Sequence, residues 1–180
     1  MTVRFKKTAV FTFGRFNPPT AGHNLLVNVL KQYNGDHYVF LSHTVNSKTD
    51  PLAYPVKKHF VELFFPGVTV GADSARTIIQ VMQNLAALEY TDVVMVVGSD
   101  RVDSFTTLLH KYNGIEYQFD HIVVESAGVR DPDGTGVSAV SASKQRQAVL
   151  AGDRVGFAVG TPNTQYSDEL FSAVLQGLSE

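Results

Sequence analysis

Short apolar runs alternate along the chain with longer segments in which apolar residues recur every three or four positions. The run Asp92–Val97 is almost continuously β-branched, which is typical of a central parallel strand buried on both faces. Strands are predicted at Thr8–Phe13, Tyr38–Ser42, Val68–Val70, Asp92–Val97 and Phe119–Val124. Helices are predicted at Ala21–Tyr33, Pro55–Phe65, Ser74–Leu88, a segment ending near Leu109, Ser141–Leu150 and Tyr166–Leu178. The alternation predicts an α/β fold, with a doubly wound parallel sheet of about five strands, helices on both faces and one domain over residues 1–180.

Four loops after predicted strands carry most of the polar and glycine residues that could bind a ligand. They span residues 14–23, 43–50, 98–101 and 126–146. In a parallel sheet with right-handed crossovers, ligands bind at the carboxyl ends of the strands, beside the point where the strand order reverses. These four loops are therefore predicted to converge on one crevice.

Composition removes several classes of function. The chain of 180 residues has a formal net charge of −2, from 15 basic and 17 acidic residues, so no global field draws it to nucleic acid or to a membrane. It has no cysteine, which excludes disulfides and thiolate chemistry, and its six histidines lack metal-ligand spacing. No apolar run approaches the length of a membrane span, and no signal-peptide pattern opens the chain. We expect a cytoplasmic protein without a dedicated metal site.

The first loop joins a strand to a helix and has the chemistry of an anion site. Thr20 is well placed to cap the helix, and free backbone N–H groups at a helix start favour phosphate. Gly14 allows a ligand to approach the backbone, and two prolines stiffen the loop. His23 lies in the first helical turn, so its ring can meet an anion bound there.

A second helix start, Val140–Arg146, offers similar chemistry. The hydroxyls of Ser141 and Ser143, with the free amides of the turn, can hold phosphate oxygens, and Arg146 adds a fixed charge about one turn later. The alternative is a simple helix cap with a surface arginine. Ser141 and Lys144 also fit the S-x-x-K pattern of serine-lysine acyl enzymes, but its partner elements are missing and we reject it.

The first loop resembles the G-x-F-x-P-x-[HT]-x-G-H signature of the nucleotidylyltransferase superfamily. Every fixed position is filled, by Gly14, Phe16, Pro18, Thr20, Gly22 and His23. The second helix start is similar to the I-S-S-T-x-[IVL]-[RK] motif of its adenylyltransferases, from which Ala142 and Gln145 depart. Gly98-Ser99-Asp100 resembles the G-x-D element of the same superfamily. The resemblance implies a Rossmann-like sheet with strand order 3-2-1-4-5.

The resemblance also implies roles for individual residues. The catalytic candidates are His23, Thr20, Lys48 and Arg146, with His23 donating a hydrogen bond to a phosphate oxygen rather than acting as a base. The nucleotide-binding candidates are Phe13, Gly14, Arg15, Phe16, Asn17, Gly22, Gly98, Asp100, Ser141, Ser143 and Lys144. Arg101 and Arg130 are the candidates for binding the acceptor, and each could instead be an ordinary solvated or charge-paired arginine.

Two positions keep competing interpretations. Asp100 could bind a ribose hydroxyl, cap the following helix, or do both. Lys48 lies in a polar loop, in a region where related enzymes place a lysine on the reacting phosphates. Lys57 and Lys58 are predicted to lie on an exposed helix face.

The activity that the resemblance implies is transfer of AMP from ATP to nicotinamide mononucleotide, which forms NAD and releases pyrophosphate. Residues 14–18 are closest to nicotinamide mononucleotide adenylyltransferases, and the motifs together also resemble proteins of large tailed bacteriophages, which would place the chain in a host cytoplasm. Mg²⁺ is expected on the triphosphate. The chain has no tryptophan to stack on a pyridine ring, which departs from many of these enzymes.

Three other functions stay open. They are a cytidylyltransferase acting on a phosphorylated alcohol, a phosphopantetheine adenylyltransferase, and a catalytically silent nucleotide-binding protein. Many relatives form homo-oligomers, and nothing in this sequence marks an interface.

Overall fold

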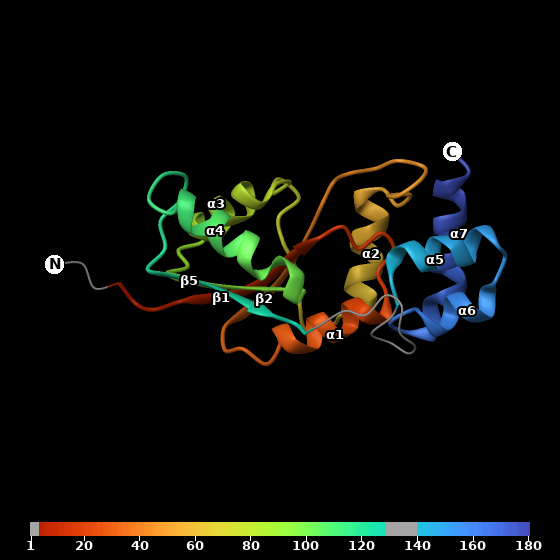
Figure 1. Cartoon of the computed structure of the whole chain (residues 1–180), viewed down its shortest axis with the longest axis horizontal. Coiled ribbons are helices and arrows are strands. Elements are labelled where there is room, and N and C mark those ends of the chain that lie inside the picture. Colours follow the sequence, from red (N-terminus) through yellow and green to blue (C-terminus); the bar gives the residue numbers. More distant parts are fainter. Residues whose placement is uncertain (1–3, 129–139) are drawn as a thin grey trace.

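The computed structural model describes residues 4–128 and 140–180 and contains a five-stranded parallel sheet (Figure 1). The strand order is β3-β2-β1-β4-β5, which confirms the predicted fold class and strand order. The strands are β1 (Thr8–Gly14), β2 (Asp36–Leu41), β3 (Thr69–Val70), β4 (Asp92–Val97) and β5 (His121–Ser126). The helices are α1 (Ala21–Leu30), α2 (Tyr54–Phe64), α3 (Ile78–Ala87), α4 (Val102–Tyr112), α5 (Ala142–Leu150), α6 (Arg154–Val159) and α7 (Ser167–Leu178). Two short 3₁₀ helices, η1 (Ser99–Arg101) and η3 (Thr164–Tyr166), complete the description.

Alternate side chains of the central strands serve two different packing layers. Phe11 of β1 shares a cluster with Met82 of α3 and Leu109 of α4, while its neighbour Val10 packs with Leu30 of α1. All five of these side chains are fully buried. Successive residues of a strand point to opposite faces, so helices cover the sheet on both sides. Figure 1 shows α3 and α4 on one side of the strands and α1 on the other.

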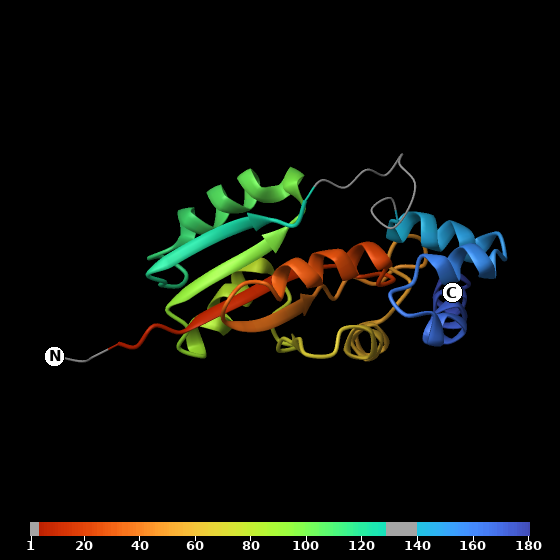
Figure 2. The same cartoon turned by 90° about the horizontal axis from the view of Figure 1, so that it is seen from below.

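The C-terminal helices α5, α6 and α7 gather beyond the carboxyl ends of the strands (Figure 2). They share a core with α2, in which Phe64 of α2, Phe157 of α6 and Leu170 of α7 are all buried. The second helix start identified in the sequence, that of α5, is therefore carried to the edge of the sheet where the strand loops emerge. This packing brings the two halves of the candidate site together.

Some element boundaries differ from the predicted ones, and local chemistry gives the reason. The helix expected from Ser74 begins at Ile78, because Thr77 caps it with a reciprocal pair of hydrogen bonds to Gln80. The first helix ends at Leu30 rather than Tyr33, and the fifth strand begins at His121. The six-residue α6 was not predicted; Asp153 caps it by accepting a hydrogen bond from the Gly156 N–H.

Because α7 packs closely on the loop before α2, we expect substitution of Gly177 to lower the stability of the protein. A Cβ added at Gly177 would overlap the carbonyl oxygen of Pro51, which is backbone and cannot rotate away. We expect Gly177→Ala to lower the free energy of unfolding by about 1–2 kcal/mol, since overpacking outweighs the gain of up to ~1 kcal/mol in helix propensity. Urea unfolding of this variant beside Gln176→Ala, an exposed neighbour on the same helix, measures the difference. A Gly177→Ala protein as stable as the control would contradict this packing.

Candidate functional site

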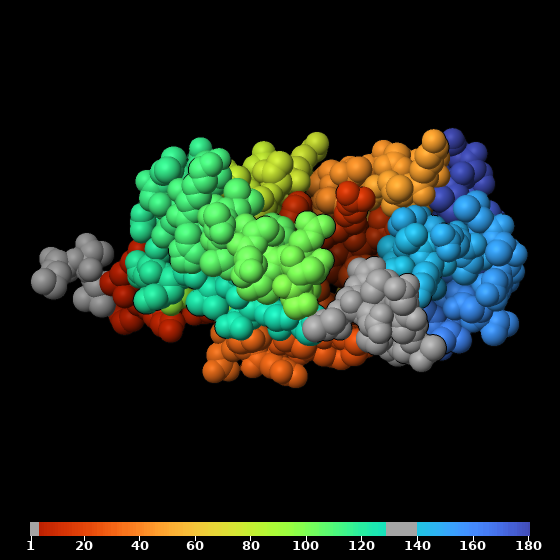
Figure 3. Space-filling model, viewed as in Figure 1, coloured from red at the N-terminus to blue at the C-terminus, as the bar shows by residue number. Residues whose placement is uncertain are grey.

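A cavity of about 770 Å³ opens at the carboxyl ends of β1 and β4, between the first turns of α1 and α5. Figure 3 shows the surface hollowed between the η1–α4 segment and α5, with the β1–α1 loop at its floor. Its volume falls within the range of roughly 300–1,000 Å³ that is usual for small-molecule sites. His23 and Arg146, which lie far apart in the sequence, both line it. The first and second helix starts therefore lie at one cavity, as the sequence predicted.

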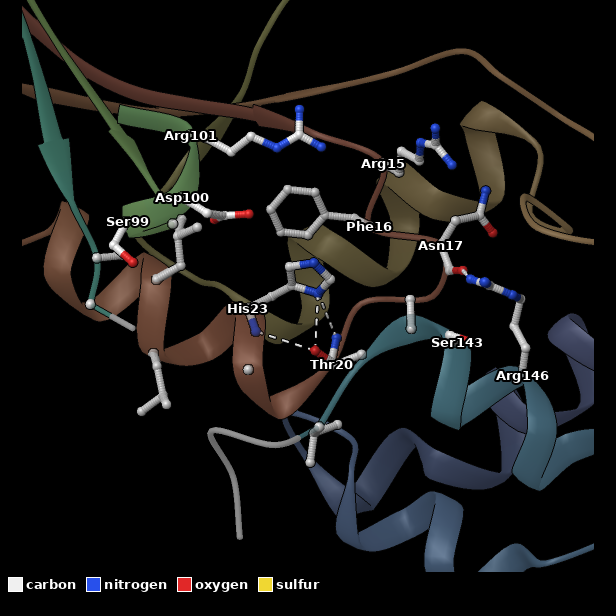
Figure 4. Close-up of a pocket in the computed structure, with 18 of the residues that line it drawn as sticks. Arg15, Phe16, Asn17, Thr20, His23, Ser99, Asp100, Arg101, Ser143 and Arg146 are labelled. Atoms are coloured by element: carbon white, nitrogen blue, oxygen red, sulfur yellow. Dashed lines mark hydrogen bonds between the residues drawn. The ribbon is translucent and has the colours of Figure 1, made fainter. Parts of the chain in front are cut away.

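Thr20 and His23 hold each other in a capping box at the start of α1 (Figure 4). The Thr20 hydroxyl accepts from the His23 backbone N–H at 3.3 Å, and His23 Nδ1 accepts from the Thr20 backbone N–H at 2.9 Å. A nitrogen that accepts a hydrogen bond carries no proton, so we infer that the neutral ring carries its proton on Nε2. The imidazole also stacks on Phe16, with ring centroids 4.2 Å apart. The ring is therefore fixed in both orientation and tautomer.

Fewer backbone N–H groups are available at α1 than its sequence predicts. The Thr20 and His23 N–H groups are used in the capping box, and the Ala21 N–H donates to the Gly160 carbonyl at 2.8 Å. Gly22, which lines the cavity, has the one N–H of this turn for which the described structure gives no acceptor. An anion here would meet one amide and the imidazole rather than a full ring of amides.

Phe13 and Gly14 support the site without lining it. Phe13 packs on the core shared with α3 and α4. A Cβ at Gly14 would lie 3.1 Å from the Phe16 ring, so glycine allows that ring to fold back over the strand end. Phe16 itself has a φ of 47° and is buried. Its place in the cavity wall comes from this tight turn, and Gly14 acts through Phe16 rather than on a ligand.

Asn17 joins three separate segments. Its buried side chain accepts from the Leu52 N–H at 2.8 Å and donates to the Leu52 carbonyl at 3.1 Å. Its own carbonyl accepts from Arg146 Nη1 at 2.9 Å. The amide is thus committed to structural hydrogen bonds, while the backbone oxygen orients the guanidinium of α5 in the cavity.

The second helix start contributes less than its sequence predicts. Ser141 is buried and its hydroxyl accepts from the Lys144 backbone N–H at 3.1 Å, so it is the helix cap of the alternative interpretation. Neither Ser141 nor Lys144 lines the cavity. Ser143 and Arg146 do line it, together with Ala142. The part of α5 that lines the cavity is thus its first turn and the guanidinium of Arg146.

The loop after β4 reaches the opposite wall of the cavity. Asp100 and Arg101 of η1 both line it, and Figure 4 shows them facing Phe16 and Arg15. Neither η1 nor α4 has a side-chain cap, so the helix-capping alternative for Asp100 does not apply. A Cβ at Gly98 would lie 2.9 Å from an Asp100 carboxylate oxygen, and its absence lets that carboxylate fold back toward the strand end.

Lys48 does not line the cavity. Lys48 is exposed in a turn whose backbone N–H groups donate to Asn46 Oδ1, and its neighbour Thr49 lines the cavity instead. Arg130 lies outside the described residues. The catalytic role of Lys48 stays a prediction that this arrangement does not support.

The prediction for Lys57 was wrong: the residue is fully buried, not exposed. Its Nζ donates to the Ser42 carbonyl at 2.7 Å, at the end of β2. Burial lowers the pKa of Lys57 to about 8, the nearby Asp50 carboxylate opposes this shift and the Arg15 charge reinforces it. A signal was available in the sequence, because Lys57 shares the spacing of the buried apolar residues of α2, Phe60, Val61 and Phe64.

Asp50 is the second residue that sequence reasoning missed. Its side chain is 1% exposed and lies 3.7 Å from Arg15 Nη1. Burial lowers the pKa of Arg146, and Asp50 opposes this shift, as it does for Lys57. The charges of Arg15 in the β1–α1 loop, Lys57 of α2 and Arg146 of α5 thus all interact with one carboxylate. The excess of positive charge favours a ligand with several negative charges.

The described residues show neither a metal cluster nor a membrane helix. Within residues 4–128 and 140–180, no three His, Asp or Glu side chains are grouped so that they could hold a metal ion. Over the same ranges, every helix is too short or too polar to cross a bilayer.

Comparison with known proteins supports the fold. The sequence matches no known protein-family profile, and it matches no curated protein. The structure is similar to that of a "putative nicotinate-nucleotide adenylyltransferase" from Vibrio parahaemolyticus, with a TM-score of 0.60, 18% sequence identity and 96% coverage of both chains. At this identity the likeness establishes the Rossmann-like architecture alone.

The capping box predicts a graded effect of substitutions at Thr20. Thr20→Val keeps the shape but loses the hydroxyl that accepts from His23, so we expect a loss of about 1 kcal/mol in unfolding free energy. Thr20→Ser retains the acceptor and should stay close to the wild type. Chemical unfolding of both variants measures the difference; equal stabilities would show that this hydrogen bond does not hold the turn.

Proposed function

We propose that the protein is a nucleotidylyltransferase that transfers AMP from ATP to nicotinamide mononucleotide, forming NAD and pyrophosphate. The observation that carries the proposal is the shared cavity: His23 at the start of α1 and Arg146 on α5 line one hollow, at the strand ends where Asp100 also lies. Three arginines, Arg15, Arg101 and Arg146, line it against one carboxylate, Asp100, which suits a polyphosphate, and its volume suits a nucleotide. The name of the similar Vibrio structure makes nicotinic acid mononucleotide the second acceptor to test.

In the proposed reaction, an oxygen of the acceptor phosphate attacks the α-phosphorus of ATP. A new P–O bond forms, the bond from the α-phosphorus to the bridging oxygen breaks, and pyrophosphate leaves with the bonding electrons. Such transfers depend on alignment and on neutralisation of charge more than on covalent help. No base is required, because the attacking phosphate is already ionised at neutral pH.

The chain's residues divide this work. His23 Nε2–H donates to a phosphate oxygen, since Nδ1 is occupied by the Thr20 backbone N–H. Arg146 and Arg15 balance charge on the polyphosphate, and the Asp100 carboxylate accepts from a ribose hydroxyl. We expect Mg²⁺ to enter with ATP as part of the substrate, because phosphate oxygens are ligands that it prefers.

The activity itself is tested by pyrophosphate release. Purified protein is incubated with Mg²⁺, each of ATP and CTP, and a panel of acceptors: nicotinamide and nicotinic acid mononucleotides, phosphopantetheine and a phosphorylated alcohol. Release with ATP and nicotinamide mononucleotide alone is the expected result. Release with another pair reassigns the substrate, and nucleotide binding without release identifies a silent binding protein.

The role of His23 predicts a loss of turnover more than of binding. We expect His23→Ala to lower kcat by about 10²–10³-fold, the usual cost of removing one preorganised donor to a developing negative charge. The KM for ATP should change little. His23→Asn keeps a polar group at the helix start, and His110→Ala, exposed on α4, is the control. A His23→Ala enzyme with near-normal kcat would exclude the donor role.

A further inference from the structure

Asp50 is a buried carboxylate with incomplete hydrogen bonding. Its Oδ2 accepts from Thr49 Oγ1 at 2.8 Å and from Asn46 Nδ2 at 3.1 Å. Its Oδ1 is buried and, among the described residues, has no hydrogen-bond partner. A buried charged oxygen left in this way is costly unless nearby opposite charge compensates for it. Arg15, Lys57 and Arg146 supply that charge.

Three cations from independent parts of the fold interact electrostatically with Asp50, and Arg15 forms an ion pair with it. Arg15 comes from the β1–α1 loop and is largely exposed, Lys57 is fully buried on α2, and Arg146 is half-buried on α5. Asp50 raises the pKa of both Lys57 and Arg146, and Arg15 lowers both. Like charges brought this close would repel one another without an anion between them. Asp50 is the anion that is present before any substrate binds.

The other groups around Lys57 do not replace Asp50. The oxygens of Ser42 accept from Nζ but are neutral. His43, on the loop after β2, has its pKa lowered by burial and by the charges of Arg76 and Lys57, while Asp73 opposes that shift. The pKa of Lys57 is therefore lowered first by burial, and the balance of Asp50 against Arg15 then adjusts it.

We propose that Asp50, which like Lys57 does not line the cavity, is a positioning residue for polyphosphate: it holds Arg15 near Arg146 and is the counter-charge of buried Lys57 until a polyphosphate binds the two arginines. The inference rests on the proposed function for its ligand. In this arrangement, the lysine whose protonation changes when the phosphates bind is Lys57, not the exposed Lys48.

A pH profile of ATP affinity follows from this arrangement. Free Lys57 is protonated below a pH of about 8, and bound polyphosphate raises its pKa further, so binding takes up a proton above that pH. Affinity should be constant below this value and fall by up to about tenfold per pH unit above it. The terminal phosphate, with a second pKa of about 6, stays ionised throughout and does not contribute.

Charge-changing variants should move this profile in opposite directions. Isothermal titration with ATP between about pH 7 and pH 9.5 is expected to show the fall begin about 1 pH unit lower in Asp50→Asn, because an opposite charge close to Lys57 is removed. In Arg15→Gln the fall should begin at higher pH, because a like charge is removed. Lys57→Arg should abolish the fall, and Lys58→Met, a half-exposed neighbour on α2, should leave it unchanged.

The outcomes separate the inference from the proposed function. An unchanged profile in both Asp50→Asn and Arg15→Gln overturns the role of Asp50, even if the wild type transfers AMP. Arg15→Gln tests the charge balance if Asp50→Asn does not fold. Shifts in the expected directions without any pyrophosphate release leave the inference intact and refute the proposed transfer. Failure of the wild type to bind ATP at every pH overturns both.

Discussion

The hydrogen bond from Arg146 to the Asn17 carbonyl is the contact on which the site depends. It joins the β1–α1 loop to α5 across 129 positions of sequence. Asn17 is itself fixed by two buried hydrogen bonds to Leu52, two residues after Asp50. One residue thus sets the position of the first loop, the arginine of the second helix start and the segment that carries the buried carboxylate.

The positive charge of this site comes mainly from arginine and lysine side chains, and less from the N-termini of α1 and α5. At α1, the capping box and the bond to Gly160 already use most of the N–H groups of the first turn. At α5, Ser141 uses the Lys144 N–H. The first turns of these helices still contribute partial positive charge, but Lys57 and Arg146 carry full charges that are buried or half-buried, where solvent screens them less than it screens exposed Arg15. A polyphosphate would gain most from these cations.

The sequence was sufficient where the determining contacts are local. The strand–loop–helix pattern, the Thr20 cap and the place of His23 involve residues within a few positions of one another, and the structure contains them all. Ser141 shows the limit of that reasoning, because a hydroxyl at a helix start satisfies a motif equally well as a cap and as a ligand. The strand order came from resemblance and is confirmed. No local pattern could reveal that Asp50 would be buried near three cations, because those cations come from the β1–α1 loop, α2 and α5.

The prediction for Lys57 failed for a different reason, because the sequence did contain the information that this residue is buried. A lysine at the spacing of Phe60, Val61 and Phe64 lies on the buried face of α2, and a buried lysine requires an acceptor and a counter-charge. Seeking those partners leads to the end of β2 and to Asp50. In helices beside a candidate site, a charged residue in register with the apolar face is therefore better assigned to the site than to the surface.

The fixed tautomer of His23 has a chemical consequence for the proposed transfer. With Nδ1 accepting from Thr20, a base at this position would have to take a proton on Nε2, which already carries one. The imidazole is thus suited to donate and unsuited to deprotonate, and an acceptor that attacks through an ionised phosphate has no proton to lose. An acceptor hydroxyl would need a base that His23 does not provide. The geometry of this single ring therefore favours phosphate-bearing acceptors over alcohols among the nucleotidyl transfers that the fold could support.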